Sequence, residues 1–315
     1  MMMRTFLIGL AAGLAAALLF AGLISGSPLA LPLFLLSPLP ISIAGLGFGT
    51  LAGAVAAGAA AALIGAVFGP VSAVLYLAIF GAPIAWGAHL VGLSRPDPAR
   101  DGDIEWFPLG MVLFRLALAI GAGVVVAGAL LGFDPSTLLP QTVAAFQELL
   151  TESGADALPA EDLTAFVRLS IALTPVTTAA LTLGITLFSL WLGGRITRLS
   201  GLLRRGWTPI PLVRLPPLAL PLLVMALLLV ALPGGSGHIA AAFAGALGFA
   251  FVVTGYGRMH VLLAGKPGRL ALLLLLYLAS FLFLIPILAM LLLGIASLVL
   301  DFRQSRAVGS DGSKS

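Results

Sequence analysis

From Thr5 to Ser94 the chain contains no Asp, Glu, Lys or Arg. A run of about 90 residues makes about 135 Å of helix at 1.5 Å per residue, enough for about four passes through a hydrocarbon core. No water-soluble core can bury so much apolar surface, and the composition agrees, because 60% of the 315 residues are hydrophobic and only 9% are charged. We therefore predict an all-α fold, a polytopic transmembrane helix bundle.

Small residues recur at every fourth position in two segments of this run. The longer series is Gly45, Gly49, Gly53, Ala57, Ala61 and Gly65, and the series near the N-terminus is Gly9, Gly13, Ala17, Ala21 and Ser25. On a helix this spacing predicts ridges almost free of side chains, the longer one about six turns in length. In a bilayer, helices associate by close backbone contact across such residues. We predict that these ridges pack helices together or bind a membrane partner.

The hydrophobic pattern predicts about nine crossings, with eight to ten as the range. The first eight lie near residues 5–25, 29–47, 48–66, 71–93, 107–131, 166–192, 216–232 and 238–262. The first is too long for the apolar region of a signal peptide and is predicted to stay uncleaved. Four prolines predict that the second is broken or re-entrant: Pro28, Pro32, Pro38 and Pro40. The last run, 270–300, fits either one long helix kinked at Pro286 or a hairpin with short arms, and we favour the single helix.

The charges between crossings predict the orientation of the bundle. Residues 134–162 carry carboxylates but no Lys or Arg, so the segment 133–165 is predicted to be external. Within it a short amphipathic helix on the membrane surface is predicted through Leu139, Val143, Phe146 and Leu150. The Arg-rich loop 194–215 is predicted to be cytoplasmic, and the N-terminus with it. Residues 1–302 then form one membrane domain, and 303–315 are predicted to be a polar, disordered tail.

Basic residues in and near the cytoplasmic loop are interpreted first as topology signals. Contact with anionic lipid headgroups is the second interpretation of the same residues. The candidate headgroup contacts are Arg195, Arg198, Arg204, Arg205, Trp207 and Arg258.

Two features within the crossings are candidates for a ligand site. Hydroxyl side chains recur at every fourth residue of the sixth crossing: Ser170, Thr174, Thr178, Thr182 and Thr186. They either line a polar cavity or bond to helix carbonyls and neighbouring helices, and we favour the second interpretation. Arg115 lies inside the fifth crossing, where a charge costs on the order of 2.5 to 3.5 kcal/mol to insert. It either reaches the headgroups, pairs with Asp103 or Glu105, or binds an anion.

Several kinds of chemistry are not predicted. His89, His238 and His260 are scattered and have no metal-ligand spacing, so we predict no metal site. The absence of cysteine excludes thiolate chemistry. Lys266 does not belong to a phosphate-binding P-loop, because the preceding glycine spacing is absent. We therefore predict no enzyme, no cofactor and no nucleic-acid partner.

Short motifs in the second half of the chain resemble those of a known family. They are Trp207 and Pro209 leading to Arg214-Leu215-Pro216, then Gly255-Tyr256-Gly257-Arg258, and Leu293-Gly294 followed by Asp301-Phe302-Arg303. With them nearly the whole chain resembles the YybS-like membrane proteins of bacteria, which implies a bacterial inner membrane. That family is itself distantly similar to the S components of energy-coupling-factor transporters. In those components small residues of the first helix dock on a coupling subunit, and Gly9, Gly13, Ala17 and Ala21 are similar.

Two functions follow as hypotheses. The first is a small-solute binding or transport subunit, with a pocket formed by the broken second segment, the hydroxyl series and Arg115. The second is a non-transporting membrane scaffold that binds another integral membrane protein through its small-residue ridges. The expected partners are the lipid bilayer and either that membrane protein or a transporter coupling module.

Overall fold

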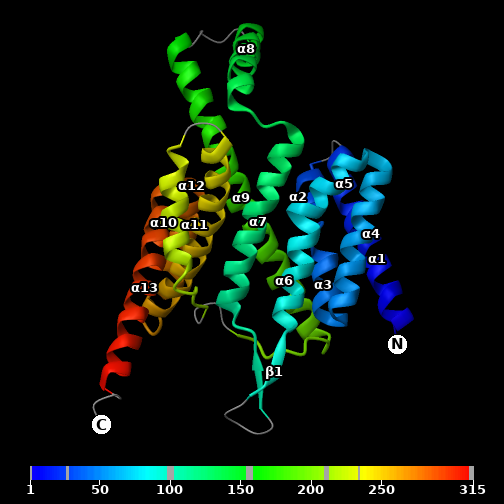
Figure 1. Ribbon diagram of the computed structural model, residues 1–315, viewed down its shortest axis with the longest axis vertical. Coiled ribbons are helices and arrows are strands. Elements are labelled where there is room, and N and C mark those ends of the chain that lie inside the picture. The colour runs from blue at the N-terminus through cyan, green and yellow to red at the C-terminus, as the bar shows by residue number, and fades with distance from the viewer. Residues whose placement is uncertain are drawn as a thin grey trace.

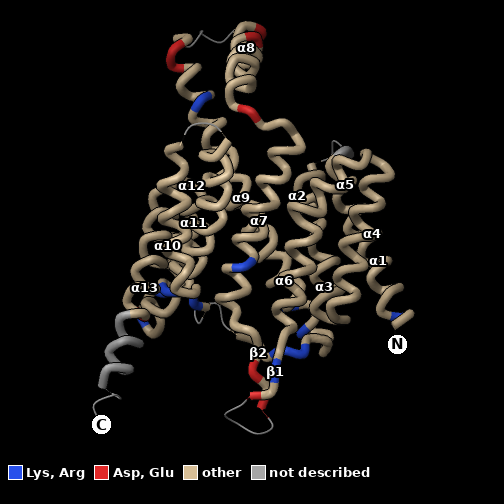
Figure 2. Tube along the Cα trace, viewed as in Figure 1, with Lys and Arg blue, Asp and Glu red and all other residues tan. Residues whose placement is uncertain are grey.

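The computed structural model describes residues 2–25, 28–97, 103–153, 159–208, 213–232 and 235–311. Within these residues the fold is helical except for one two-stranded ribbon. Eight segments of the described chain are long and apolar enough to cross a membrane: Met2–Ala21, Ala30–Phe48, Thr50–Phe68, Pro70–Gly92, Leu109–Leu131, Ala160–Leu199, Gly235–Leu262 and Leu284–Phe302. They lie side by side along one axis (Figure 1), so the predicted all-α membrane bundle is confirmed. Most Lys and Arg residues gather at the ribbon end of this bundle (Figure 2).

The small-residue segment 45–65 is not one helix. The chain forms α1 (Met2–Ala21), a 3-10 turn η1 (Gly22–Ser25), α2 (Ala30–Leu35), α3 (Leu39–Phe48) and α4 (Thr50–Phe68). Gly49 interrupts the predicted ridge, because its φ of 95° lies in a region that favours glycine and turns the chain. Gly45 and Gly53 therefore face each other from neighbouring helices, and a Cβ at Gly53 would lie 3.0 Å from the Cα of Gly45.

Proline breaks the second segment as predicted, between α2 and α3 near Pro38. The fourth span is also irregular, because α5 (Pro70–Tyr76) continues through a π-helical turn η2 (Leu77–Gly81) into α6 (Ala82–Gly92). Beyond α6, β1 (Ser94–Pro96) and β2 (Ile104–Trp106) pair antiparallel, with Ser94 opposite Trp106. These strands were not predicted, because a strand of only three residues is too short to show an alternating pattern.

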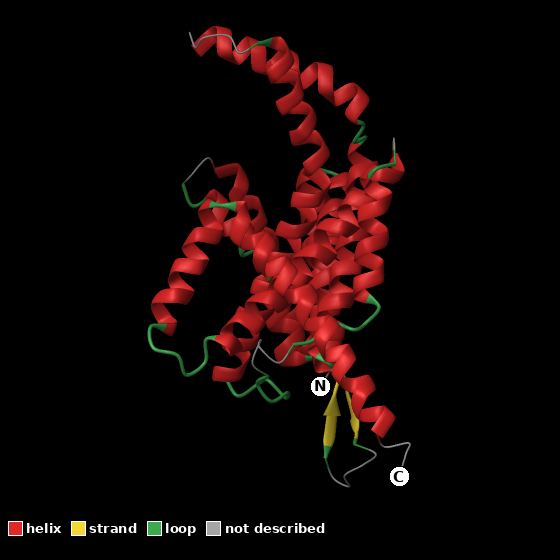
Figure 3. Ribbon diagram, turned by 90° about the vertical axis from the view of Figure 1, so that its left-hand side faces the viewer, coloured by secondary structure: helices red, strands yellow, loops and turns green. Residues whose placement is uncertain are grey.

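The segment predicted to be external forms a helical hairpin. After α7 (Leu109–Leu131) come α8 (Pro135–Ser153) and α9 (Ala160–Leu199), and α9 is 40 residues long. That is about 60 Å, twice the thickness of a hydrocarbon core, and the first turns of α9 extend beyond the bundle together with α8 (Figure 3). Leu139 and Val143 pack against buried Leu163 and Val167 of α9. The amphipathic helix thus exists, but part of its apolar face covers α9 and not a membrane surface.

The prediction of one long helix over 270–300 is wrong. The chain forms α10 (Ala219–Val230), α11 (Gly235–Leu262), α12 (Arg269–Leu282) and α13 (Leu284–Asp311). The break lies at Phe283, which is extended, and Pro286 stands in the first turn of α13, where no backbone donor is needed. In Figure 3, α12 leans away from the bundle and α13 returns across it, toward the end that holds the ribbon and the N-terminus. The helix continues to Asp311, within the segment predicted to be a disordered tail.

The most buried of the eight spans is α11, which packs against α7, α9, α10 and α13. Its contact with α13 depends on one glycine in each helix, and each glycine faces the backbone of the other helix. A Cβ at Gly255 would overlap the carbonyl oxygen of Met290, and a Cβ at Gly294 would overlap that of Phe251. This close approach fixes α13 against α11.

Candidate functional site

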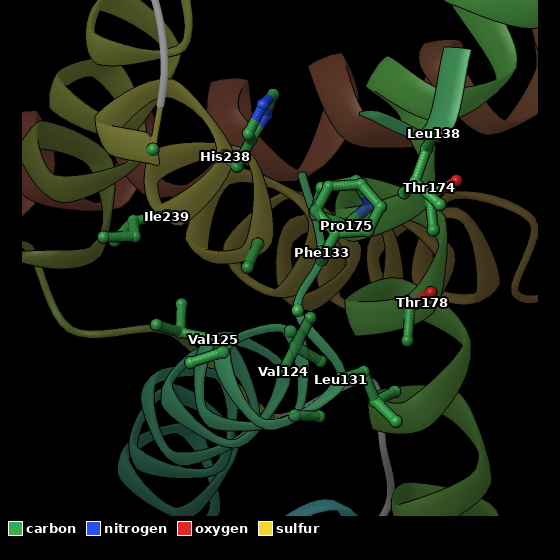
Figure 4. Close-up of a pocket in the computed structure, with 16 residues that line it drawn as sticks. Val124, Val125, Leu131, Phe133, Leu138, Thr174, Pro175, Thr178, His238 and Ile239 are labelled. Atoms are coloured by element: carbon green, nitrogen blue, oxygen red, sulfur yellow. The ribbon is translucent and has the colours of Figure 1, made fainter. Parts of the chain in front are cut away.

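A cavity of about 460 Å³ lies between α7, α9 and α11, at the end of the bundle that carries α8. Its walls are mostly apolar and include Val124 and Val125 of α7, Phe133 after α7, and Ile239 of α11 (Figure 4). Apolar walls with a few polar groups are typical of sites that bind small molecules. This cavity is therefore the strongest candidate for a ligand site in the described part of the chain.

Small residues line the space where the three helices meet. Gly132 ends α7 in the left-handed conformation, with a φ of 65°, and turns the chain toward α8. Gly128 and Ala242 line the cavity from α7 and α11. On the third side α9 contains Pro175, which has no N–H, so the carbonyl of Ile171 lacks its usual helical donor.

Three polar side chains reach the cavity wall. Thr174 and Thr178 lie on α9, and His238 lies on α11 on the opposite side (Figure 4). The Thr174 hydroxyl donates to the carbonyl of Ser170 at 2.9 Å, so it is already bonded within its own helix. The His238 ring packs edge-on against Phe133, with 5.6 Å between ring centroids. Thr178 and His238 therefore offer polar groups to a ligand that is otherwise surrounded by carbon.

An acidic residue stands next to the mouth of the cavity. Asp134 accepts hydrogen bonds from the Ser136 hydroxyl at 2.7 and 2.8 Å and from the Ser136 N–H at 3.0 Å. These bonds from Ser136, and a weaker attraction from His238, hold the pKa of Asp134 below its usual value. The carboxylate thus keeps its negative charge beside His238.

The structure does not bring the five predicted hydroxyls together. Ser170 and Thr174 are exposed and bond back to carbonyls four residues earlier, whereas Thr182 and Thr186 are buried in the bundle. Each four-residue step turns about 40° past a full turn, so the series winds around α9 instead of following one face. Only Thr174 and Thr178 line the cavity.

Arg115 lies away from this cavity. Its guanidinium stacks over the ring of Phe107, 4.8 Å from the centroid, and so extends toward the ribbon end of α7. Glu105, one of its two predicted partners, instead pairs with Arg95 at 2.7 Å. The position fits a side chain that reaches toward the headgroups.

The predicted ridges contact the chain's own helices. Gly9 and Gly13 face α4, and a Cβ at Gly13 would lie 2.6 Å from the Cβ of Ala59. Ala17 is buried. A Cβ at Gly65 would lie 2.8 Å from the Cβ of Ala73 of α5.

The predicted headgroup contacts divide into three groups. Arg195 and Arg198 both lie over the Trp207 ring, each 5.5 Å from its centroid. Arg205 is half-buried and donates to the carbonyl oxygens of Phe107 at 2.7 Å and Val91 at 3.4 Å. Arg204 is exposed, and Arg258 is partly exposed near the end of α11.

Sequence reasoning missed Pro175, Asp134 and the role of His238 at the cavity. Pro175 carried a usable signal, since a proline inside an apolar run leaves a carbonyl without its donor. His238 carried none, because only the fold places it beside Phe133 and opposite Thr178.

Within the described residues, no group of three His, Cys, Asp or Glu side chains is placed to hold a metal ion. Comparisons with protein-family models, curated proteins and solved structures give no match.

Proposed function

We propose that this multi-pass membrane protein is a solute-binding subunit of a transport system, and that its solute occupies the cavity between α7, α9 and α11. The observation that carries the proposal is the cavity itself, about 460 Å³ in volume and apolar except for Thr174, Thr178 and His238. A ligand that suits these walls is a small, largely apolar molecule with one or two polar groups.

The polar groups define the expected contacts. The Thr178 hydroxyl both donates and accepts, and the His238 ring offers a donor or an acceptor depending on its tautomer. Pro175 lies on the cavity wall within the continuous helix α9 and leaves the carbonyl of Ile171 without its helical donor. The resemblance to YybS-like proteins, and through them to transporter S components, points in the same direction.

The orientation inferred from charge supports capture from outside. With the Arg-rich end in the cytoplasm, as the positive-inside rule predicts, the cavity end faces the exterior. We infer a bacterial inner membrane from the family resemblance, and the proposal includes no catalytic step.

The scaffold hypothesis receives less support. Its proposed partner surface was the small-residue ridges, but Gly9, Gly13 and Gly65 already contact α4 and α5 of the same chain. A scaffold would have to use other faces.

The test is a variant that fills the cavity. Gly128→Leu adds a side chain on the cavity wall at a position where a Cβ makes only an ordinary contact, 3.6 Å from Phe133. Mass spectrometry of protein purified in mild detergent should show a small molecule in the wild type and its loss in Gly128→Leu. The matched control is Gly248→Leu on α11, where a Cβ would meet nothing within 4 Å.

Thr178→Val then refines the contact. It keeps the side-chain shape and removes the hydroxyl, so we expect about fivefold weaker binding, corresponding to one neutral hydrogen bond of about 1 kcal/mol. Equal solute content in the wild type and Gly128→Leu would rule out the cavity as the site.

A further inference from the structure

Two adjoining cavities lie at the opposite, basic end of the bundle. The first, of about 210 Å³, is lined by Gly49, Thr50, His89, Gly92, Arg204 and Arg205. It lies where the α3–α4 turn, the end of α6 and the loop after α9 meet. Its side chains supply two guanidinium groups and an imidazole, and none of its described lining residues is acidic.

The groups around this first cavity are held in place by other contacts. Arg205 is fixed by its bond to the carbonyl of Phe107 at 2.7 Å, and Thr50 bonds to Nδ1 of His89 at 2.8 Å. Arg204 remains exposed, and its guanidinium is available to a ligand. The first turn of α4 begins at Thr50, so its backbone N–H groups add a smaller positive contribution at the same place.

The second cavity is apolar. It has a volume of about 190 Å³ and is walled by side chains that include Leu113, Leu187, Trp191 and Trp207. The two cavities share four lining residues: Leu46, Val91, Leu203 and Arg205. A cationic space and an apolar space thus meet on either side of Arg205.

We propose that the paired cavities hold one anionic phospholipid, with its phosphate at Arg204 and Arg205 and part of an acyl chain in the apolar cavity. Guanidinium groups bind phosphate oxygens through paired, charge-assisted hydrogen bonds. Burial of an acyl chain gives the apolar cavity a use that a free phosphate ion cannot. The site lies at the end of the bundle away from the solute cavity, so it does not depend on the proposed function.

The experiment measures lipid binding to the full chain in mild detergent by native mass spectrometry. Phosphatidylglycerol, phosphatidylcholine and inorganic phosphate are added separately to delipidated protein, and lipid that co-purifies is measured on untreated protein. We expect phosphatidylglycerol to bind more tightly than phosphatidylcholine, and inorganic phosphate to give neither an adduct nor competition.

Three variants test the two halves of the site. Arg204→Gln removes the free charge and should weaken phosphatidylglycerol binding about tenfold. Gly92→Leu fills the cationic cavity and Gly206→Leu the apolar one, each at a position where a Cβ would meet nothing within 4 Å. Their matched controls are Arg168→Gln, at the α8 end, and Gly58→Leu, an exposed glycine of α4.

The outcomes separate the alternatives. Loss of phosphatidylglycerol in the three variants but not in the controls supports the proposal. Binding or competition by inorganic phosphate would overturn it in favour of a free-anion site. Equal phosphatidylglycerol binding by Arg204→Gln and Arg168→Gln would overturn the placement of the lipid phosphate. No effect of Gly206→Leu would overturn the placement of the acyl chain in the apolar cavity.

Discussion

The contact between α1 and α4 and the cavity between α7, α9 and α11 are built from the same small residues, yet one is closed and the other open. In the first, Gly13 of α1 lies against Ala56 and Ala59 of α4, and Ala56 is completely buried. In the second, Gly128 and Ala242 line a space of about 460 Å³. Glycine and alanine therefore do not by themselves close a helix interface.

The difference lies in what stands beside the small residues. Along α1 and α4 the small residues face each other, so the two backbones meet and gain van der Waals contact. Around the cavity, Gly132 turns the chain out of α7, and Pro175 interrupts the hydrogen bonding of α9. Small side chains then leave volume that nothing fills, and only such volume can receive a ligand.

The largest effect is expected at the closed contact. Gly13→Leu places a side chain where its Cβ alone would lie 2.6 Å from the Cβ of Ala59 and 2.7 Å from the Ala56 carbonyl oxygen. Both neighbours are parts of α4 that cannot swing aside, so α1 must move away. We expect a loss of about 3 kcal/mol or more in the free energy of unfolding, measured by thermal unfolding in detergent.

The control for this change is an exposed glycine of α4, on the surface that faces away from α1. Gly58→Leu adds the same side chain to α4 at an exposed position where a Cβ meets nothing within 4 Å. It should leave stability unchanged or raise it by up to about 0.8 kcal/mol, because leucine favours a helix more than glycine does. Equal melting temperatures for the two variants would mean that α1 and α4 are not in close contact.

The same contrast explains what the sequence could predict. Gly9 and Gly13 show their packing role directly, because four-residue spacing on a helix defines a face. The single-helix interpretation of 45–65 failed at Gly49, since a glycine that turns the chain and one that packs a helix look alike in a sequence. The helix break at Phe283 was not predicted for a related reason. A kink was predicted at the nearby Pro286, because proline usually marks one, whereas the break lies three residues earlier.

The cavity was harder to predict than the closed contact. Thr174 and Thr178 were identified, but as part of a series that winds around α9. The rest of the cavity wall comes from α7 and α11, and no sequence spacing relates Val124 or His238 to Thr178. Cavities depend on how far separate helices diverge, which is a property of the packed fold.

A smaller effect is expected from a buried hydroxyl in the closed core. Thr186 is fully buried, and its hydroxyl has no hydrogen-bond partner among the described residues. Thr186→Val keeps the shape and removes the unpaired group, so we expect unchanged stability or a gain of up to about 1 kcal/mol. The matched variant is Ser42→Ala, because the Ser42 hydroxyl is buried and donates to the Ser189 carbonyl at 2.8 Å.

Ser42→Ala should lose about 1 kcal/mol, the opposite sign. Thermal unfolding of both variants under one detergent condition gives the comparison. A destabilised Thr186→Val would show that the Thr186 hydroxyl has a partner, such as an ordered water, and that this part of the core is less closed than the contact of α1 with α4.

The smallest effect is expected at the mouth of the open region and depends on pH. Ser136 holds the pKa of Asp134 below its usual value in the folded chain, so the stability that this carboxylate contributes is present above the unfolded pKa, about 3.9. It is lost as the pH falls through the folded pKa.

Ser136→Ala should raise the pKa of Asp134 toward its usual value, which a carboxyl ¹³C NMR titration measures. The control is Ser153→Ala, at the far end of α8, which should leave the pKa of Asp134 unchanged. If Asp134 titrates at the same pH in both variants, the hydrogen bonds from Ser136 do not lower its pKa. Because Asp134 is fully exposed, the effect on overall stability should stay small. Acid should therefore loosen the start of α8 at the cavity mouth while the contact between α1 and α4, which has no ionisable group among its packed residues, keeps its stability.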